Sequence, residues 1–93
     1  MKVRDITEAR STKLLNECYG TDPAETLDKI NEEHNEFFLA ATIGDLERIK
    51  DEASDVIAIM VRYCNNHGWT VQELLEMAID KATQRKTNPN YKR

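Results

Sequence analysis

The sequence predicts an all-α protein, in which an antiparallel helical hairpin with flanking helices assembles into a four-helix bundle by oligomerisation. Apolar residues recur at the spacing of an α-helix, no stretch alternates as a strand does, and capping residues bracket the helical stretches. With 93 residues, the chain is expected to form a single domain over residues 1–93. Helices are predicted over residues 6–18 (a weak one), 23–43, 46–67 and 71–86, and a C-terminal tail over 87–93.

The hairpin is predicted from the start and stop signals of its two helices. Asp22 can cap the first helix, Pro23 suits its first position, and Glu25 lies in its first turn. Gly44 is expected to end that helix, and Asp45 to cap the next one. Because only this short turn joins them, the two helices must run antiparallel.

The flanking helices carry their own signals. The capping box Thr70-Val71-Gln72-Glu73 opens the helix over 71–86, and Asn88-Pro89 marks its end. Asp5-Ile6-Thr7-Glu8 can open the weaker N-terminal helix, which Gly20 closes.

Apolar stripes predict which helix faces are buried, because residues three and four apart share one side of a helix. We also expect His34 to pack on the apolar face of its helix. The expected stripes are Leu27, Ile30, Phe37, Phe38 and Ala41 on the first hairpin helix, Leu46, Ile49, Ala53, Val56, Ile57, Met60 and Cys64 on the second, and Leu74, Leu75, Ala78, Ile79 and Ala82 on the helix over 71–86.

Surplus apolar side chains predict that copies of the chain associate. Ile59 and Val61 lie off the main stripe of the second hairpin helix, and Phe37 with Phe38 broadens the stripe of the first. A chain this short buries only about 60–65% of the surface that its unfolded form exposes, so its own core is thin. We therefore expect a homodimer, with a homotetramer second, in which two hairpins pack into a four-helix bundle.

Composition and charge exclude several classes of protein. No apolar run is long enough for a membrane span, and the first residues lack the apolar core of a signal peptide, so a cytoplasmic protein without a membrane partner is expected. Cys18 and Cys64 should then be reduced thiols. The net charge of −4 argues against a general nucleic-acid binder.

Four carboxylates form a repeated pattern on the two hairpin helices. Glu33 and Glu36 flank the apolar stripe of the first helix, and Glu52 and Asp55 occupy the equivalent positions on the second. In an antiparallel hairpin the two pairs can approach each other, and a hard divalent cation such as Mg²⁺ would relieve their repulsion. The alternative is a solvated acidic face with ordinary ion pairs, such as Lys29 with Glu33 or Arg48 with Glu52.

These residues also match a family motif. Glu32-Glu33-His34-Asn35-Glu36 and Glu52-Ala53-Ser54-Asp55 fit E-E-x-x-E … E-x-x-D, and the chain from about Leu27 to Arg85 resembles the all-α nucleoside triphosphate pyrophosphohydrolases. This superfamily includes the MazG-like proteins, the dimeric dUTPases and phosphoribosyl-ATP pyrophosphohydrolase. The resemblance implies Mg²⁺-dependent hydrolysis between the α and β phosphates of a nucleoside triphosphate, with Mn²⁺ as a substitute metal. It also implies catalytic roles for the five acidic residues, namely metal binding by Glu33, Glu36, Glu52 and Asp55, and support of the site or of the attacking water by Glu32.

Basic residues near the end of the helix over 71–86 are candidates for substrate binding. Lys81 and Arg85 are four apart on its expected inward edge and can hold phosphate oxygens. The competing interpretation is that they complement the helix dipole. Arg62, on the carboxylate side of the second hairpin helix, is a weaker candidate that can instead pair with Asp55.

The main functional hypothesis is a MazG-like nucleoside triphosphate pyrophosphohydrolase that controls the nucleotide pool. Phosphoribosyl-ATP pyrophosphohydrolase of histidine synthesis is the first alternative, and a non-catalytic helical interaction module is the second. No Ser-Tyr-Thr segment, which the phosphoribosyl-ATP enzymes carry, precedes Leu27, and the chain continues through 81–85 where those enzymes typically stop. Both departures favour the MazG-like hypothesis.

Overall fold

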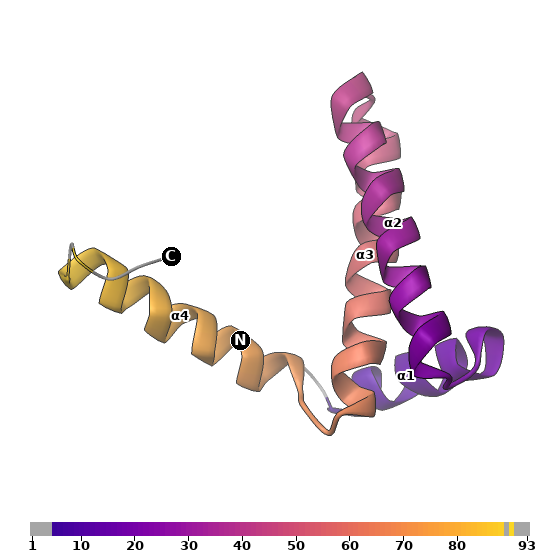
Figure 1. The fold of residues 1–93 in the computed structure, drawn as a ribbon, viewed down its shortest axis with the longest axis horizontal. Helices are drawn as coiled ribbons and strands as arrows, with labels where there is room; N and C mark the ends of the chain where they lie inside the picture. Colours follow the sequence, from indigo (N-terminus) through magenta and orange to yellow (C-terminus); the bar gives the residue numbers. More distant parts are fainter. Residues whose placement is uncertain (1–4, 89, 91–93) are drawn as a thin grey trace.

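The computed structural model describes residues 5–88 and 90 and shows an all-α chain with no strand among those residues. The N-terminal residues 1–4 and most of the expected tail, residues 89 and 91–93, lie outside the described residues. Every predicted helix is present, and each helix bound lies within one residue of the predicted one. The helices are α1 (Asp5–Tyr19), α2 (Pro23–Ile43), α3 (Leu46–Asn66) and α4 (Val71–Thr87) (Figure 1).

The predicted capping residues make the expected hydrogen bonds. The Asp22 carboxylate accepts from the backbone N–H of Ala24 at 2.8 Å, and the Asp45 carboxylate accepts from that of Arg48 at 3.2 Å. Between these two helices Gly44 has a φ of 83°, in the left-handed region that glycine reaches without strain. The hairpin turn is therefore determined by local chemistry.

Figure 1 shows how the helices are arranged in space. α2 and α3 lie side by side as the antiparallel hairpin, and α1 packs across the end of α3 that is distant from the hairpin turn. α4 leaves that same end and projects away from the hairpin, with few contacts to the other helices.

A fully buried arginine joins α1 to α3. Arg62 donates from Nε to the Asn16 side-chain oxygen at 3.0 Å, and from Nη2 to the carbonyl oxygen of Gly20. The prediction that Arg62 contacts phosphate or pairs with Asp55 is therefore wrong. Its charge is used inside the fold, because carbonyl and amide oxygens at the end of α1 need buried donors.

A buried glutamate fixes the start of α4. One carboxylate oxygen of Glu8 accepts from the backbone N–H of Val71 at 2.8 Å and from the side chain of Asn65 at 3.1 Å. Asn65 also donates to the carbonyl oxygen of Trp69 and accepts from Thr12. This network holds α1, the end of α3 and the first turn of α4 together at one corner.

The hydrophobic core is small and covers most of the stripe predicted on α3, since Cys64 is buried and Ile49, Ala53, Val56 and Met60 are half-buried. The prediction is wrong for three residues of this helix. Ile59, expected off the main stripe, is only 2% exposed, whereas Ile57 and Leu46 are largely exposed. α1 and α2 approach α3 on the side that carries Ile59 and Arg62, and this contact decides which residues are covered. His34, predicted to pack on the apolar face, is exposed on α2.

Among the described residues, most of the expected inward face of α4 is left uncovered. Leu74 is half-buried, while Leu75, Ala78, Ile79 and Ala82 are exposed. Further large apolar side chains are exposed on the hairpin: Leu27, Phe38, Leu39, Ile43, Leu46 and Ile57. None of the described helices is both long and apolar enough to cross a membrane.

Candidate metal centre

The hairpin brings carboxylates from α2 and α3 together, as the repeated pattern predicts. One oxygen each of Glu33, Glu36 and Glu52 lie within 4.8 Å of one another. Asp51, Glu52 and Asp55 form a second group, in which one oxygen of each also lies within 4.8 Å of the others. Glu52 belongs to both groups. Glu52 of α3 thus lies close to acidic side chains of both helices.

Two oxygens in this cluster are buried without a hydrogen-bond donor. They are Oε2 of Glu33, on a buried side chain, and Oε2 of Glu52, on a half-buried one. Removing a carboxylate oxygen from water without a partner is unfavourable, and a bound cation removes that penalty. An all-oxygen carboxylate set suits a hard divalent ion, so these residues fit Mg²⁺ or Mn²⁺.

The electrostatics of Glu36 reflect this crowding. Its pKa is raised, first by partial loss of solvent around the carboxylate, then by the charge of Glu52 and a hydrogen bond shared with it, and then by the charge of Glu32. Lys29 opposes the shift. The raised pKa means that the charged form of Glu36 is less favourable beside its acidic neighbours, and a metal ion would offset this repulsion.

Lys29 forms ion pairs with two glutamates of its own helix, Glu32 and Glu33. Its Nζ lies 3.1 Å from Oε1 of Glu33 and 3.4 Å from Oε1 of Glu32. The hydrogen bond to Glu33 is the main reason that the pKa of Lys29 is raised. Two ion pairs are expected for a solvated face. The pair between Lys29 and Glu33 forms, whereas the described side chains of Arg48 and Glu52 form none with each other.

A small cavity links this ion pair to the second carboxylate group. Its volume is about 40 Å³, enough for a single water molecule. It brings Asp55 of α3 to the same space as Glu33 of α2, with α1 closing one side. The lining residues are Leu15, Tyr19, Lys29, Glu33, Asp55, Ala58 and Ile59.

Sequence reasoning missed one acidic member of the site. Asp51 joins Glu52 and Asp55 in the second carboxylate group and is exposed on α3. Its position four residues before Asp55 places both on the same side of the helix, and this spacing is the signal that could have found it. Glu32, in contrast, is exposed, lies in neither group and contacts Lys29.

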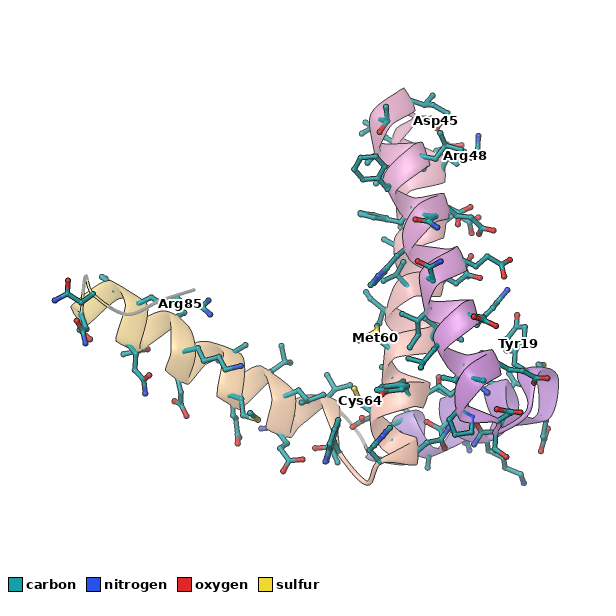
Figure 2. The ribbon with its side chains drawn as sticks, viewed as in Figure 1. Tyr19, Asp45, Arg48, Met60, Cys64 and Arg85 are labelled. Carbon is teal, nitrogen blue, oxygen red and sulfur yellow. The ribbon has the colours of Figure 1, made fainter. Side chains whose placement is uncertain are left out.

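The predicted substrate-binding residues are not brought to the carboxylates within one chain. Lys81 and Arg85 are exposed on α4, and Figure 2 shows Arg85 toward the far end of that helix, away from the hairpin. Their expected inward position is therefore wrong for a single chain, because α4 does not fold back onto α2 and α3. Arg85 fits the alternative interpretation, since it lies in the last helical turn, whereas Lys81 lies before that turn.

A larger groove lies apart from the acidic cluster. Its volume is about 680 Å³, and it runs between α1 and the turn that joins α3 to α4. None of the predicted site residues lines it; its walls include Glu8, Thr12, Asn16, Asn65 and Trp69.

Comparison with known protein families gives a match over most of the chain. The profile of the phosphoribosyl-ATP pyrophosphohydrolase family matches residues 4–83, a range that includes α1, both carboxylate groups and most of α4. No curated protein and no solved structure shows a significant match.

Proposed function

We propose, from the premise that this chain belongs to the phosphoribosyl-ATP pyrophosphohydrolase family, that it hydrolyses phosphoribosyl-ATP to phosphoribosyl-AMP and pyrophosphate. Membership makes the chain a pyrophosphohydrolase, a hydrolase that acts on acid anhydrides, and it disfavours the non-catalytic module. It also reverses the order of the two enzymatic hypotheses. The match begins ahead of Leu27 and continues past Lys81, so neither departure that favoured a MazG-like substrate separates the chain from this family.

The observation that carries the proposal is the carboxylate cluster with its unpartnered buried oxygens. We propose Glu33, Glu36, Glu52 and Asp55 as the metal ligands, as the motif implies. The clustering of Glu33, Glu36 and Glu52 within 4.8 Å supports this set. The cavity that Asp55 shares with Glu33 supports its inclusion, and Asp51 is a further ligand candidate.

The proposed chemistry divides between the metal and the side chains. A bound divalent ion would neutralise the phosphates and stabilise the charge that develops on the leaving pyrophosphate. Glu36 serves as a ligand in its ionised form, since a protonated carboxyl is a poor one. We propose that Glu32, which is exposed and contacts Lys29, supports the site or orients the attacking water.

A second copy of the chain is part of the proposal. The apolar side chains left exposed on the hairpin and on α4 are the surface that an oligomer would cover, and a homodimer is the first expectation, a homotetramer the second. Since α4 projects away from its own hairpin, Lys81 and Arg85 would reach phosphate only at the site of a partner. The small anionic substrate and the net charge of −4 favour a cytoplasmic enzyme with no nucleic-acid partner.

Pyrophosphate release tests the function. We expect phosphoribosyl-ATP to yield pyrophosphate in the presence of Mg²⁺ or Mn²⁺, and activity to disappear with EDTA or in Glu52→Gln. The matched control is Glu47→Gln, which removes an exposed carboxylate from the first turn of the same helix. Orthophosphate as the first product would contradict the cleavage position. Turnover of ordinary nucleoside triphosphates in preference to phosphoribosyl-ATP would restore the MazG-like hypothesis.

A further inference from the structure

We propose that Lys29 is a positioning residue that holds Glu33 ready to bind the metal ion, and that Tyr19 of α1 holds Lys29 in turn. The inference rests on the proposed function, because it assumes that Glu33 is a ligand. It assigns a direct influence on metal affinity to α1, a helix that carries none of the proposed metal ligands.

The first argument is how the two oxygens of Glu33 are used. Oε1 forms an ion pair with the Lys29 ammonium at 3.1 Å, while Oε2 is buried without a donor. A carboxylate whose second oxygen is tethered in this way cannot rotate freely. Outer-shell partners of this kind orient metal ligands and contribute to affinity.

The second argument is that the pair differs from a surface ion pair. The side chains of Lys29 and Glu33 are only 21% and 9% exposed. In an isolated helix, a lysine four residues before a glutamate is the less favourable order, so helix electrostatics alone give little reason for the contact. Burial beneath α1 supplies the reason.

The third argument is a chain of contacts that fixes the ammonium group. The Lys29 Nζ lies 4.9 Å from the centre of the Tyr19 ring, and the Arg62 guanidinium carbon lies 5.9 Å from the same centre. Arg62 also binds the carbonyl oxygen of Gly20, the next residue after Tyr19. The buried arginine thus places the end of α1, the tyrosine ring there faces Lys29, and Lys29 holds Glu33.

A positioning role and a purely electrostatic role of Lys29 predict opposite changes in metal affinity when the lysine is replaced. Removing a positive charge beside a cation site should tighten metal binding if Lys29 acts only through its charge. Removing the tether of a ligand should weaken binding by about tenfold or more. The direction of the change therefore separates the two roles.

The test is calorimetric titration of the whole chain with Mn²⁺, without substrate. We expect Lys29→Met to weaken Mn²⁺ binding about tenfold, and Lys29→Arg to restore most of the wild-type affinity, because a guanidinium also donates to a carboxylate. Lys50→Met removes an exposed charge from α3 and should leave the affinity unchanged or slightly increased. Mn²⁺ binding by Lys29→Met that is equal to or tighter than wild type would overturn the inference. Wild-type protein that binds no Mn²⁺ would instead overturn the metal centre of the proposed function.

A second pair of variants covers the case in which Lys29→Met does not fold, which circular dichroism would reveal. Tyr19→Leu removes the ring that faces the ammonium, whereas Tyr19→Phe keeps it. We expect weaker Mn²⁺ binding in Tyr19→Leu and near wild-type binding in Tyr19→Phe. Equal affinities in these two variants would show that α1 does not influence the ligand, and would contradict the contact chain.

Discussion

One carboxylate oxygen of Glu36 on α2 lies within 4.8 Å of one of Glu52 on α3, although both residues are acidic. Two carboxylates this close repel each other, and a bound cation removes that repulsion. The hairpin is therefore folded in a form that a metal ion would stabilise further.

Metal should raise the melting temperature of the wild-type chain. A ligand that binds only the folded state at about 100 times its Kd adds about 2.7 kcal/mol of stability. We expect a clear upward shift with millimolar Mg²⁺ or Mn²⁺ in differential scanning calorimetry. Glu36→Gln and Asp55→Asn should fold normally and lose that shift, whereas Glu47→Gln should keep it. Identical melting curves with and without metal in the wild type would contradict the metal centre.

The pH dependence of stability should show the effect of the raised pKa of Glu36. The pKa of Glu36 is raised in the folded state. Its contribution to the free energy of unfolding is therefore fully present below the pKa that Glu36 has in the unfolded chain, and it is lost as the pH rises through the pKa that Glu36 has in the folded chain. In metal-free buffer, urea denaturation should show this loss in the wild type and not in Glu36→Gln. A difference between the two proteins that stays constant across that pH range would contradict the crowded carboxylates.

Removing Arg62 should destabilise the junction between α1 and α3. Arg62→Met leaves the Asn16 side chain and the Gly20 carbonyl without their buried donor, which should cost about 3 kcal/mol. Arg48→Met, at an exposed position on the same helix, should change stability by less than about 0.5 kcal/mol. Chemical denaturation measures the free energy of unfolding of both variants. Equal losses would show that the buried contacts of Arg62 do not stabilise the fold more than an exposed arginine does.

The two cysteines should differ sharply in reactivity. Burial, and then the nearby charge of Glu8, raises the pKa of the Cys64 thiol, so it remains protonated at neutral pH, while Cys18 is exposed. In Cys18→Ser, labelling by a thiol reagent should be slow until urea unfolds the chain. In Cys64→Ser, labelling should be fast in the native protein. Rapid native labelling of Cys64 would show that the core opens there.

Exposed apolar residues should be covered by a second copy. Ile57 of α3 is 64% exposed, and Ile79 of α4 is equally open. We expect light scattering to give a dimer or tetramer for the wild type, and a mass closer to the 10.7 kDa monomer for Ile57→Glu or Ile79→Glu. Lys86→Glu, a charge change at an exposed position on α4, should leave the assembly intact. A wild-type monomer at micromolar concentration that still releases pyrophosphate would show that the assembly is unnecessary.

The sequence by itself determined the helices and the antiparallel hairpin that allows the carboxylates to approach, because these depend on local chemistry. Asp22, Gly44 and Thr70 end or begin helices through hydrogen bonds and backbone angles within a few residues. The short turn at Gly44 then forces α2 and α3 to run antiparallel. In that geometry the acidic pairs can approach each other, and the packing of α2 against α3 decides that they do.

The tertiary structure alone decided the faces and the remote contacts. Periodicity shows that α3 has an apolar side, but packing against α1 and α2 rotates it so that Ile59 and Arg62 are buried and Ile57 is exposed. The same packing places Tyr19 over Lys29, a contact between residues on different helices that no spacing in the sequence signals. The direction of α4 follows from the network around Glu8, and it carries Lys81 away from the carboxylates of its own chain. These outcomes depend on long-range contacts, in which small differences in burial decide between several faces that are nearly equally apolar.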